Sequence, residues 1–134
     1  MMKIGEFARK AGETVDTLRY YDRINLLVPE RKKGGSRHYG EKDLQKIKEI
    51  QVLKSLDFTL EEIKTILDMD RELDECLEKG MSEAEVFKAK KETVEKLRKL
   101  IKEKLGELAR KEKEIKQARS RLNEIKSKLE APDG

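Results

Sequence analysis

The chain has 134 residues, of which 45% are charged and only 36% are hydrophobic. This composition predicts one small domain with long solvated helices, because there is too little apolar material for a thick core. It holds no run of about 18 apolar residues that could span a membrane and no apolar signal-peptide core, and its one cysteine, Cys76, excludes an intrachain disulfide framework. We therefore expect a cytoplasmic protein without membrane contact.

Positive charge is concentrated in the N-terminal part. Residues 1–56 hold 13 Lys and Arg against 8 Asp and Glu, whereas residues 57–134 hold 19 against 20. A basic excess of this kind favours a polyanionic partner such as nucleic acid.

Two short helices are predicted first. The first covers residues 3–11 and should stop at Gly12, because it carries an apolar stripe at helical spacing, formed by Ile4, Phe7, Ala8 and Ala11. Thr14 can cap the second, which should run to about Ile24.

The second helix contains two adjacent tyrosines with different predicted roles. Neighbouring residues on a helix point about 100° apart, so Tyr20 and Tyr21 cannot share one face. Tyr21 should pack inward with Val15 and Leu18, with its hydroxyl on a polar partner. Tyr20 should point outward, together with Thr17 and Arg19, and these groups suit base edges and phosphates.

The segment "PERKKGGSRHYG", residues 29–40, predicts a hairpin loop with short flanking strands. It is the only part of the chain in which strands are expected. Its basic and polar residues could lie along a phosphate backbone.

Three helical segments are expected between the hairpin and Gly80. A stripe that starts after Glu41 predicts one helix, and the Thr59/Glu62 capping box opens another. A short amphipathic segment that carries Cys76 should end near Gly80.

The longest predicted element begins at the second capping box, Ser82 with Glu85, and runs to about residue 130. Apolar residues recur there at every seventh position, namely Phe87, Val94, Ile101, Leu108, Ile115, Leu122 and Leu129. The companion position holds Leu97, Ala118 and Ile125 but also Lys90, Lys104 and Lys111. This pattern predicts a coiled coil that needs a partner helix, with a second copy as the expected partner. The predicted dimerisation residues are Val94, Leu97, Ile101, Leu108, Ile115, Leu122 and Ile125. A lone charged helix held by pairs one turn apart is the alternative.

The order of the N-terminal elements is that of a helix-turn-helix with a wing. The second helix would enter a major groove of DNA, and the hairpin would lie on the flanking backbone.

At this point the segment from residue 4 to residue 67 resembles the MerR family of bacterial transcription regulators. The combination of "LRYYDRINLL", "SRHYG" and "FTLEEI" carries the resemblance. It implies a mainly α fold, namely a winged helix-turn-helix with a small β-hairpin wing and a long antiparallel coiled-coil dimerisation helix. It also implies a homodimer that binds a pseudo-palindromic promoter, distorts the DNA and so helps RNA polymerase.

Carried over by position, the resemblance places DNA contacts on Arg19, Tyr20, Arg31, Arg37 and Tyr39. With the neighbouring polar and basic groups, the full set of predicted DNA-binding residues is Thr17, Arg19, Tyr20, Arg31, Lys32, Lys33, Arg37, His38 and Tyr39. Asn25 and Asp57 stand where many members have glycine. We expect left-handed backbone at both, because Asn and Asp tolerate it best. Ser36 replaces a common aromatic residue, which Lys32, Lys33 or His38 could offset.

The predicted domains are residues 1–69 for DNA binding, 70–81 as a short helical connector, 82–130 as the dimerisation helix and 131–134 as a tail. We predict no metal site and no cofactor, because Cys76 alone cannot build a soft-metal site and His38 belongs to the wing. Cys76 is expected to be a small core residue. Three alternatives stay open, namely an effector pocket within the dimer, a protein without an effector, and a chain that has been shortened.

Two classes of function remain. The first is a dimeric sequence-specific DNA-binding regulator. The second is a coiled-coil scaffold whose basic N-terminal module docks protein, although this leaves the "RKKGGSR" segment unexplained. An enzyme is not expected, since no catalytic set of residues is present.

Overall fold

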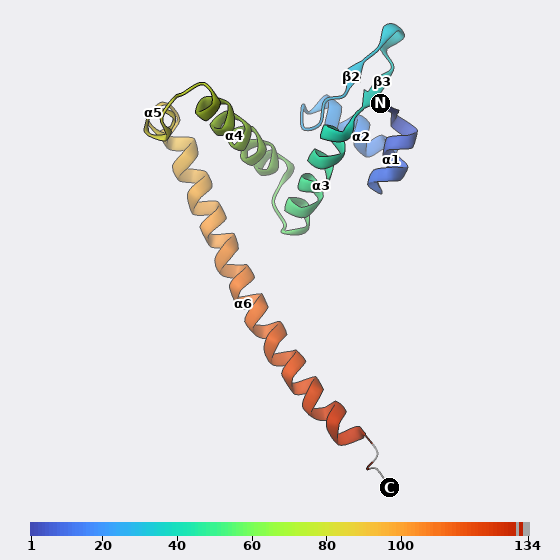
Figure 1. The fold of residues 1–134 in the computed structure, drawn as a ribbon, viewed down its shortest axis with the longest axis vertical. Coiled ribbons are helices and arrows are strands. Elements are labelled where there is room, and N and C mark those ends of the chain that lie inside the picture. The colour runs from blue at the N-terminus through green and yellow to red at the C-terminus, as the bar shows by residue number, and fades with distance from the viewer. Residues whose placement is uncertain (131, 133–134) are drawn as a thin grey trace. The chain divides into compact units, whose positions relative to one another are not determined.

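In the computed structural model, which describes residues 1–130 and 132, the chain forms two compact units, Met1–Glu78 and Lys79–Gly134. Most of the chain is helical, and one small sheet lies in the first unit (Figure 1). The predicted fold class is confirmed. The proposed tail at 131–134 falls almost wholly outside the described residues, and the domain boundaries stay predictions.

The two N-terminal helices lie where the sequence predicts them. Helix α1 covers Ile4–Ala11 and ends at Gly12, whose φ of 70° is left-handed. Helix α2 covers Val15–Arg23, and the hydroxyl oxygen of Thr14 accepts from the amide of Thr17 as an N-terminal cap. The tight turn between the helices therefore has a cap on each side.

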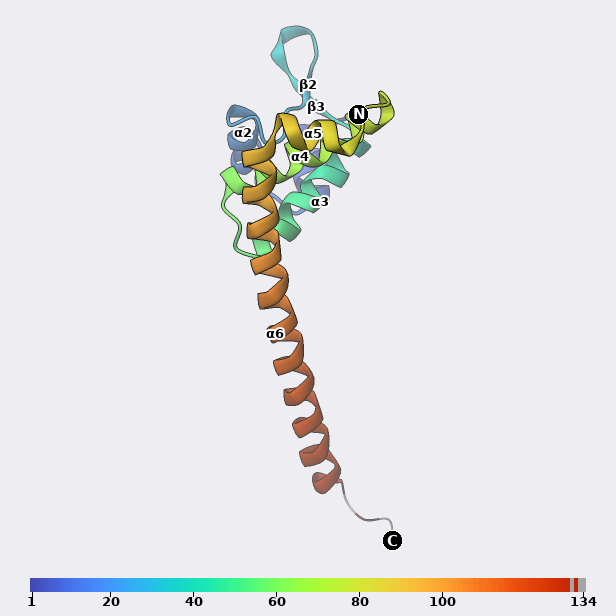
Figure 2. The same ribbon diagram turned by 90° about the vertical axis from the view of Figure 1, so that its left-hand side faces the viewer.

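The sheet has three short antiparallel strands in the order β1-β3-β2. Strands β2, Glu30–Arg31, and β3, Arg37–Tyr39, form the expected hairpin, and Arg31 pairs with Arg37. Strand β1, Met2–Lys3, corrects the expectation that strands occur only in the hairpin. It ties the start of the chain to β3. Figure 2 shows the loop between β2 and β3 projecting beyond the helices of this unit.

Two longer helices complete the first unit. Helix α3 covers Glu41–Ser55, and helix α4 covers Leu60–Glu78. The Thr59/Glu62 capping box forms, since each side chain bonds the other's backbone amide. No break separates the predicted connector from the preceding helix, because α4 runs through that segment. The expectation of a separate short helix there was wrong.

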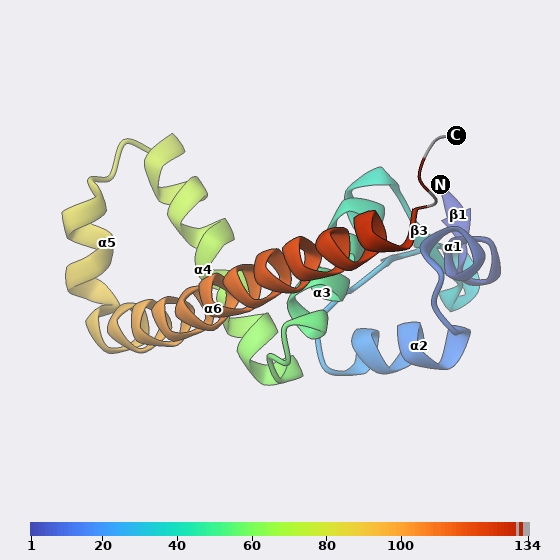
Figure 3. The ribbon, with the colours of Figure 1, turned by 90° about the horizontal axis from the view of Figure 1, so that it is seen from below.

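The expected long helix is divided at Lys90. Helix α5 covers Glu83–Ala89, and helix α6 covers Lys91–Leu129. Lys90 has φ −125° and ψ 35°, which is not helical, and α5 meets the start of α6 at an angle (Figure 3). The Ser82 hydroxyl accepts from the amide of Glu85, so the capping residue is as predicted but the helix it opens is short. At 39 residues, α6 is about 58 Å long.

The first unit has a continuous apolar core. Phe7 of α1 stacks on Tyr39 of β3, with ring centroids 4.3 Å apart, and both are fully buried. The other residues of this unit that are buried to 2% exposure or less are Leu18, Tyr21, Leu26, Leu27, Ile47, Ile50 and Ile63. These core residues come from α1, α2, the segment that follows α2, β3, α3 and α4.

Among the described residues, two that are not glycine have left-handed backbone, as predicted. Asn25 follows α2 with φ 58°, and Asp57 follows α3 with φ 65°. Among the described residues, no helix combines the length and apolarity that crossing a bilayer requires.

Candidate nucleic-acid interface

The outward face of α2 carries the predicted reading groups. The Arg19 side chain is 54% exposed and its guanidinium lies 3.7 Å from the carboxylate of Asp16. Tyr20 is 44% exposed, whereas Tyr21 is 1% exposed, so the predicted outward and inward orientations of the two tyrosines are confirmed. Thr17 lies one turn before Tyr20 with its hydroxyl oxygen 2.8 Å from that of Thr14.

Tyr20 is held in place by its neighbours. The guanidinium of Arg23 lies 5.7 Å from the centroid of its ring, which is the geometry of a cation–π contact. The ring of Tyr21 lies 6.4 Å away and is tilted by 46°. An exposed tyrosine between these groups has fewer free rotamers.

A buried carboxylate connects α2 to the wing. Asp22 is 8% exposed, and its Oδ2 accepts from Nη2 of Arg31 at 2.6 Å and from Nε of Arg37 at 2.7 Å. Arg31 and Arg37 come from the two wing strands, so one side chain of the helix holds both. Charge-assisted bonds this short fix geometry as well as adding energy.

Arg31 also closes the wing loop. Its Nη1 donates to the carbonyl oxygen of Gly35 at 3.2 Å, in addition to its bond with Asp22. Gly34 and Gly35 have φ of 85° and 82°, which is left-handed backbone that favours glycine. The loop tip is thus oriented relative to α2 through a chain of contacts from Asp22 to Gly35.

The remaining wing groups reach solvent. Lys32 and Lys33 are exposed, and the Lys32 ammonium lies 3.5 Å from the carboxylate of Glu30. His38 is half-buried, with Nε2 3.1 Å from the Ser36 hydroxyl. Arg37 keeps a quarter of its side chain exposed. A phosphate could therefore meet the lysines directly and the arginines without breaking their bonds to Asp22, because each guanidinium has five donors.

Tyr39 lies in the core. It is 0% exposed, and its hydroxyl oxygen is buried without a hydrogen-bond partner among the described residues. Burial, followed by the nearby Asp22 carboxylate, raises the pKa of Tyr39 above its ordinary value. Tyr39 is thus buried in the free protomer, where it stacks on Phe7, and its direct contact with DNA stays a prediction.

The Tyr21 hydroxyl also differs from the expectation. It is buried and has no hydrogen-bond partner in the described part of the chain. The ring packs as predicted, but the polar partner expected for its hydroxyl is missing.

The turn that precedes α2 is fixed by α3. The side-chain amide of Gln51 donates to the carbonyl oxygen of Ala11 and to the Glu13 carboxylate, both at 2.9 Å. These bonds hold the α1–α2 turn from behind. The outward face of α2 is therefore presented by a rigid unit rather than by a loop.

Sequence reasoning missed Asp22, although a signal was present. Asp22 follows Leu18 by four residues and Val15 by seven, so it falls on the apolar face of the helix. A carboxylate on that face must be paired when it is buried. Two arginines in the hairpin that follows were available partners.

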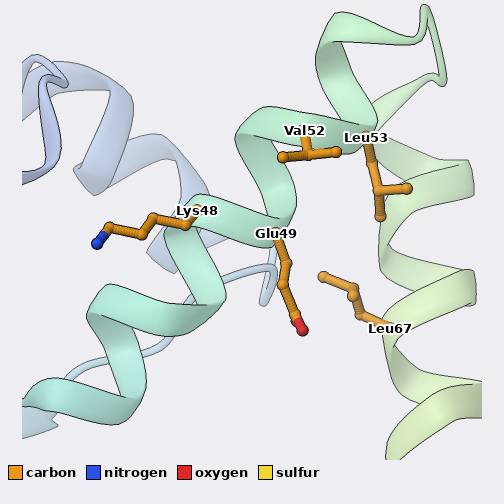
Figure 4. Close-up of a pocket in the computed structure, with 5 residues that line it drawn as sticks. All are labelled: Lys48, Glu49, Val52, Leu53 and Leu67. Carbon is orange, nitrogen blue, oxygen red and sulfur yellow. The ribbon is translucent and has the colours of Figure 1, made fainter.

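An open hollow of about 360 Å³ lies between α3 and α4. Lys48, Glu49, Val52, Leu53 and Leu67 line it, and the Lys48 ammonium points away from it (Figure 4). Its lining is mostly apolar and offers few groups to orient a ligand. It lies apart from the α2 face and the wing.

Cys76 is only half-buried, so the expectation of a core residue is met in part. It lies on α4 with Leu77, which is 49% exposed. Within the described residues, no group of His, Cys, Asp and Glu is arranged to hold a metal ion.

The predicted dimerisation residues divide into two sets. Val94 and Leu97 are 8% and 7% exposed, and the nearby Val86 of α5 is buried as well. Ile101, Ile115, Leu122 and Ile125 are exposed, and Leu108 is half-buried. The first two therefore serve the protomer itself, and the stripe that is open to a partner begins at Ile101.

Comparisons with known proteins agree with this geometry. Residues 2–70 match the model of the MerR HTH family regulatory protein. The regulator YfmP of Bacillus subtilis is 30% identical over 96% of this chain and 93% of its own length. A MerR family regulator structure from Bacillus cereus is 31% identical, covers 98% of this chain and 87% of that one, and superposes with a TM-score of 0.52.

A third comparison includes a nucleic acid. The crystal structure of HiNmlR, a MerR family regulator lacking the sensor domain, bound to promoter DNA, is 27% identical with a TM-score of 0.50. It covers 88% of this chain and 92% of that one. From the family match over more than half of its residues and the relatives that span nearly all of them, this chain belongs to the MerR family of transcriptional regulators.

Proposed function

We propose that this regulator binds promoter DNA as a homodimer, with α2 in the major groove and the wing on the flanking backbone. The observation that carries the proposal is the Asp22 connection. It joins a helix with exposed Arg19 and Tyr20 to a basic hairpin. A protein-docking module needs no such coupling between a reading helix and a wing, and nothing in the comparisons favours a scaffold.

The groups divide into two kinds by their chemistry. Arg19 has an exposed guanidinium, paired only loosely with Asp16 at 3.7 Å, that could read a guanine edge with two hydrogen bonds. Tyr20 and Thr17 could bond phosphate or bases. Lys32, Lys33 and the exposed edges of Arg31 and Arg37 are suited to phosphates. His38 would lie beside them. The first kind would give specificity, and the second would give affinity that depends on salt.

Promoter activation would follow from distortion of the DNA. A dimer with a rigid reading unit at each end can bend or untwist the segment between two half-sites. Bending a DNA site of about 20–30 base pairs by about 40–90° costs about 1–6 kcal/mol, which the phosphate contacts of the wings would offset. The shape change of the DNA would let RNA polymerase engage the promoter. We place this activity in the cytoplasm. We propose regulation rather than catalysis, since the relatives are transcriptional regulators.

The test compares two arginines with matched surroundings. Arg19 pairs with Asp16 three residues earlier at 3.7 Å, and Arg71 of α4 pairs with Asp68 three residues earlier at 3.8 Å. Their side chains are 54% and 61% exposed. In gel-shift titrations with a selected DNA site, Arg19→Ala should cost about 1–3 kcal/mol and relax specificity at one base position.

Arg71→Ala is the control and should leave affinity unchanged. Equal losses for the two variants would show that general positive charge, and not the face of α2, drives binding. If the unmodified chain showed no site preference at moderate salt, the proposal would fail as a whole.

A further inference from the structure

The C-terminal half of α6 presents an apolar stripe to solvent. Every residue from Lys111 to Leu129 is exposed, including Ile115 at 57%, Leu122 at 65% and Leu129 at 80%. A helix that repeats apolar residues every seven positions buries them against another helix. The charges that border this stripe identify that helix and its position.

The two edges of the stripe change sign part-way along. The first part carries only acidic border residues, Glu107, Glu112 and Glu114. The later part carries only basic ones, Arg119, Arg121, Lys126 and Lys128. Charged residues at these border positions set the partner and the direction of a coiled coil. The sequence around Lys116 and Gln117 separates the two clusters.

The family resemblance already implies an antiparallel pair of dimerisation helices; we propose that the two copies of α6 align with their two-fold axis between Lys116 and Gln117. The acidic cluster of each copy then meets the basic cluster of the other. Glu112 lies beside Arg119 of the second copy, Glu114 beside its Arg121 and Glu107 beside its Lys128. Symmetry doubles these three pairs, and no like charges meet across the seam.

The apolar layers agree with this alignment. Leu108 lies opposite Ile125 of the second copy, and Ile115 lies opposite its Ala118. Leu122 covers the aliphatic stem of Lys111, which can keep its ammonium in water. The start of α6, up to and including Ile101, stays outside the paired segment, and within it Val94 and Leu97 are already buried in the protomer.

Other alignments that keep the stripe together oppose like charges. If the axis moves by half a heptad toward the N-terminus, Glu112 lies beside Glu112 of the second copy and Glu114 beside its Glu114. Moving the axis by a full heptad places Glu107 beside Glu114 and Arg98 beside Arg119. Parallel pairing sets Glu107 beside Glu112 and Arg121 beside Lys126. Like-charged neighbours destabilise such contacts.

Existing ion pairs within α6 do not compete strongly. Arg121 is 3.0 Å from Glu124, but both side chains are about 60% exposed, and a guanidinium has donors for a second carboxylate. Glu107 lies 3.4 Å from Lys104 on the same helix. A carboxylate can accept from both lysines.

The inference rests on the proposed homodimer. Disulfide cross-linking in the full chain tests the alignment of α6 separately from the existence of the dimer. Three variants are made with Cys76→Ser, each with two new cysteines. Leu108→Cys with Ile125→Cys reports the proposed axis. Ile101→Cys with Ile125→Cys reports the half-heptad shift, and Ile101→Cys with Ala118→Cys reports the full shift.

Sedimentation before oxidation shows whether a dimer exists. A monomer at micromolar concentration would overturn the proposed homodimer together with this alignment. In a dimer, mild oxidation should produce a covalent dimer at least about tenfold faster for the first variant than for the other two. Faster cross-linking of the second or third variant would overturn the alignment but not the dimer. The same holds if none of the three variants forms a covalent dimer.

A charge reversal tests the acidic and basic clusters without new cysteines. Changing Glu107, Glu112 and Glu114 to Lys should raise the dimer dissociation constant about tenfold or more. The control changes Glu95, Glu103 and Glu124, which lie outside the seam, to Lys with the same change in net charge, and should raise it less than about threefold. Adding Glu at Arg119, Arg121 and Lys128 to the first variant should restore dimerisation. Equal effects of the two triple variants, or no recovery, would contradict the proposed pairs.

Discussion

The two units of the chain bury their apolar residues in different ways. In Met1–Glu78, Phe7, Tyr39 and Ile47 are fully buried by other residues of the same unit. In Lys79–Gly134, Ile115 and Leu122 are more than half exposed. The first unit therefore has its stability built into one chain, whereas the exposed stripe of α6 would be covered by the proposed second copy, so that its stability would depend on protein concentration.

The same Ile→Ala truncation in each unit should give the largest difference between burial within one protomer and burial by a second copy. Ile47→Ala removes a fully buried side chain from α3 and should lower the free energy of unfolding by about 2–5 kcal/mol. Ile115→Ala should leave the unfolding of the monomer nearly unchanged and weaken dimerisation. Urea unfolding at two protein concentrations distinguishes the variants. A concentration-dependent loss for Ile47→Ala would break the comparison.

The Asp22 connection should be the next largest effect. Asp22→Asn removes the charge that pairs with Arg31 and Arg37, and we expect a loss of about 1–3 kcal/mol in stability together with weaker DNA binding. The control is Asp68→Asn, because Asp68 also lies near two cations, Lys64 at 3.0 Å and Arg71 at 3.8 Å, but is 36% exposed. It should cost less than about 1 kcal/mol.

Thermal unfolding and gel-shift titration measure the two consequences of Asp22→Asn separately. If stability fell while DNA affinity stayed the same, Asp22 would hold the fold without positioning the wing. That result would remove the main support for coupled reading by α2 and the wing.

A wing lysine should change salt dependence more than specificity. Lys33→Ala should lower DNA affinity for all sequences and reduce the slope of log affinity against log salt by about 1. Lys54→Ala on α3 is the control, since Lys54 is exposed but lies outside the hairpin. Fluorescence anisotropy at several salt concentrations provides the slopes. Identical slopes for the two variants would place the wing away from the phosphates.

The smallest effects should come from the left-handed residues of the first unit. Asn25→Gly and Asp57→Gly relieve backbone strain at φ 58° and 65°, and each should raise stability by a few tenths of a kcal/mol to about 1 kcal/mol. Gln45→Gly within α3 should instead lower it by about 1 kcal/mol. Chemical unfolding would measure all three. A loss at Asn25 or Asp57 would indicate that those side chains make stabilising contacts.

Much of the first unit could be predicted because its signals are local. Thr14, Gly12 and the Thr59/Glu62 box mark helix ends by their own chemistry, and the wheel of α2 separates Tyr20 from Tyr21. Strand β1 could not be predicted, because two residues carry no alternating pattern and their pairing depends on β3. The burial of Tyr39 likewise depends on Phe7, which is distant in sequence.

In the second unit the long helix was predicted, but its break at Lys90 was not. The seven-residue pattern continues through Phe87 and Val94, so nothing in it marks Lys90 as the end of α5. The chain changes direction at Lys90, where α5 packs on α6. The spacing of apolar residues in the sequence does not predict such packing. Asp22 had a local signal, but its two arginine partners become evident only when the hairpin folds back on α2.

The most direct test of the account is selection of bound duplexes from a random pool by the full chain. We expect enrichment of a two-fold symmetric site, with two half-sites whose spacing is set by the α6 dimer. Arg19→Ala should relax the same position in both half-sites. Enrichment of a single unsymmetric half-site, or of no sequence at all, would contradict it.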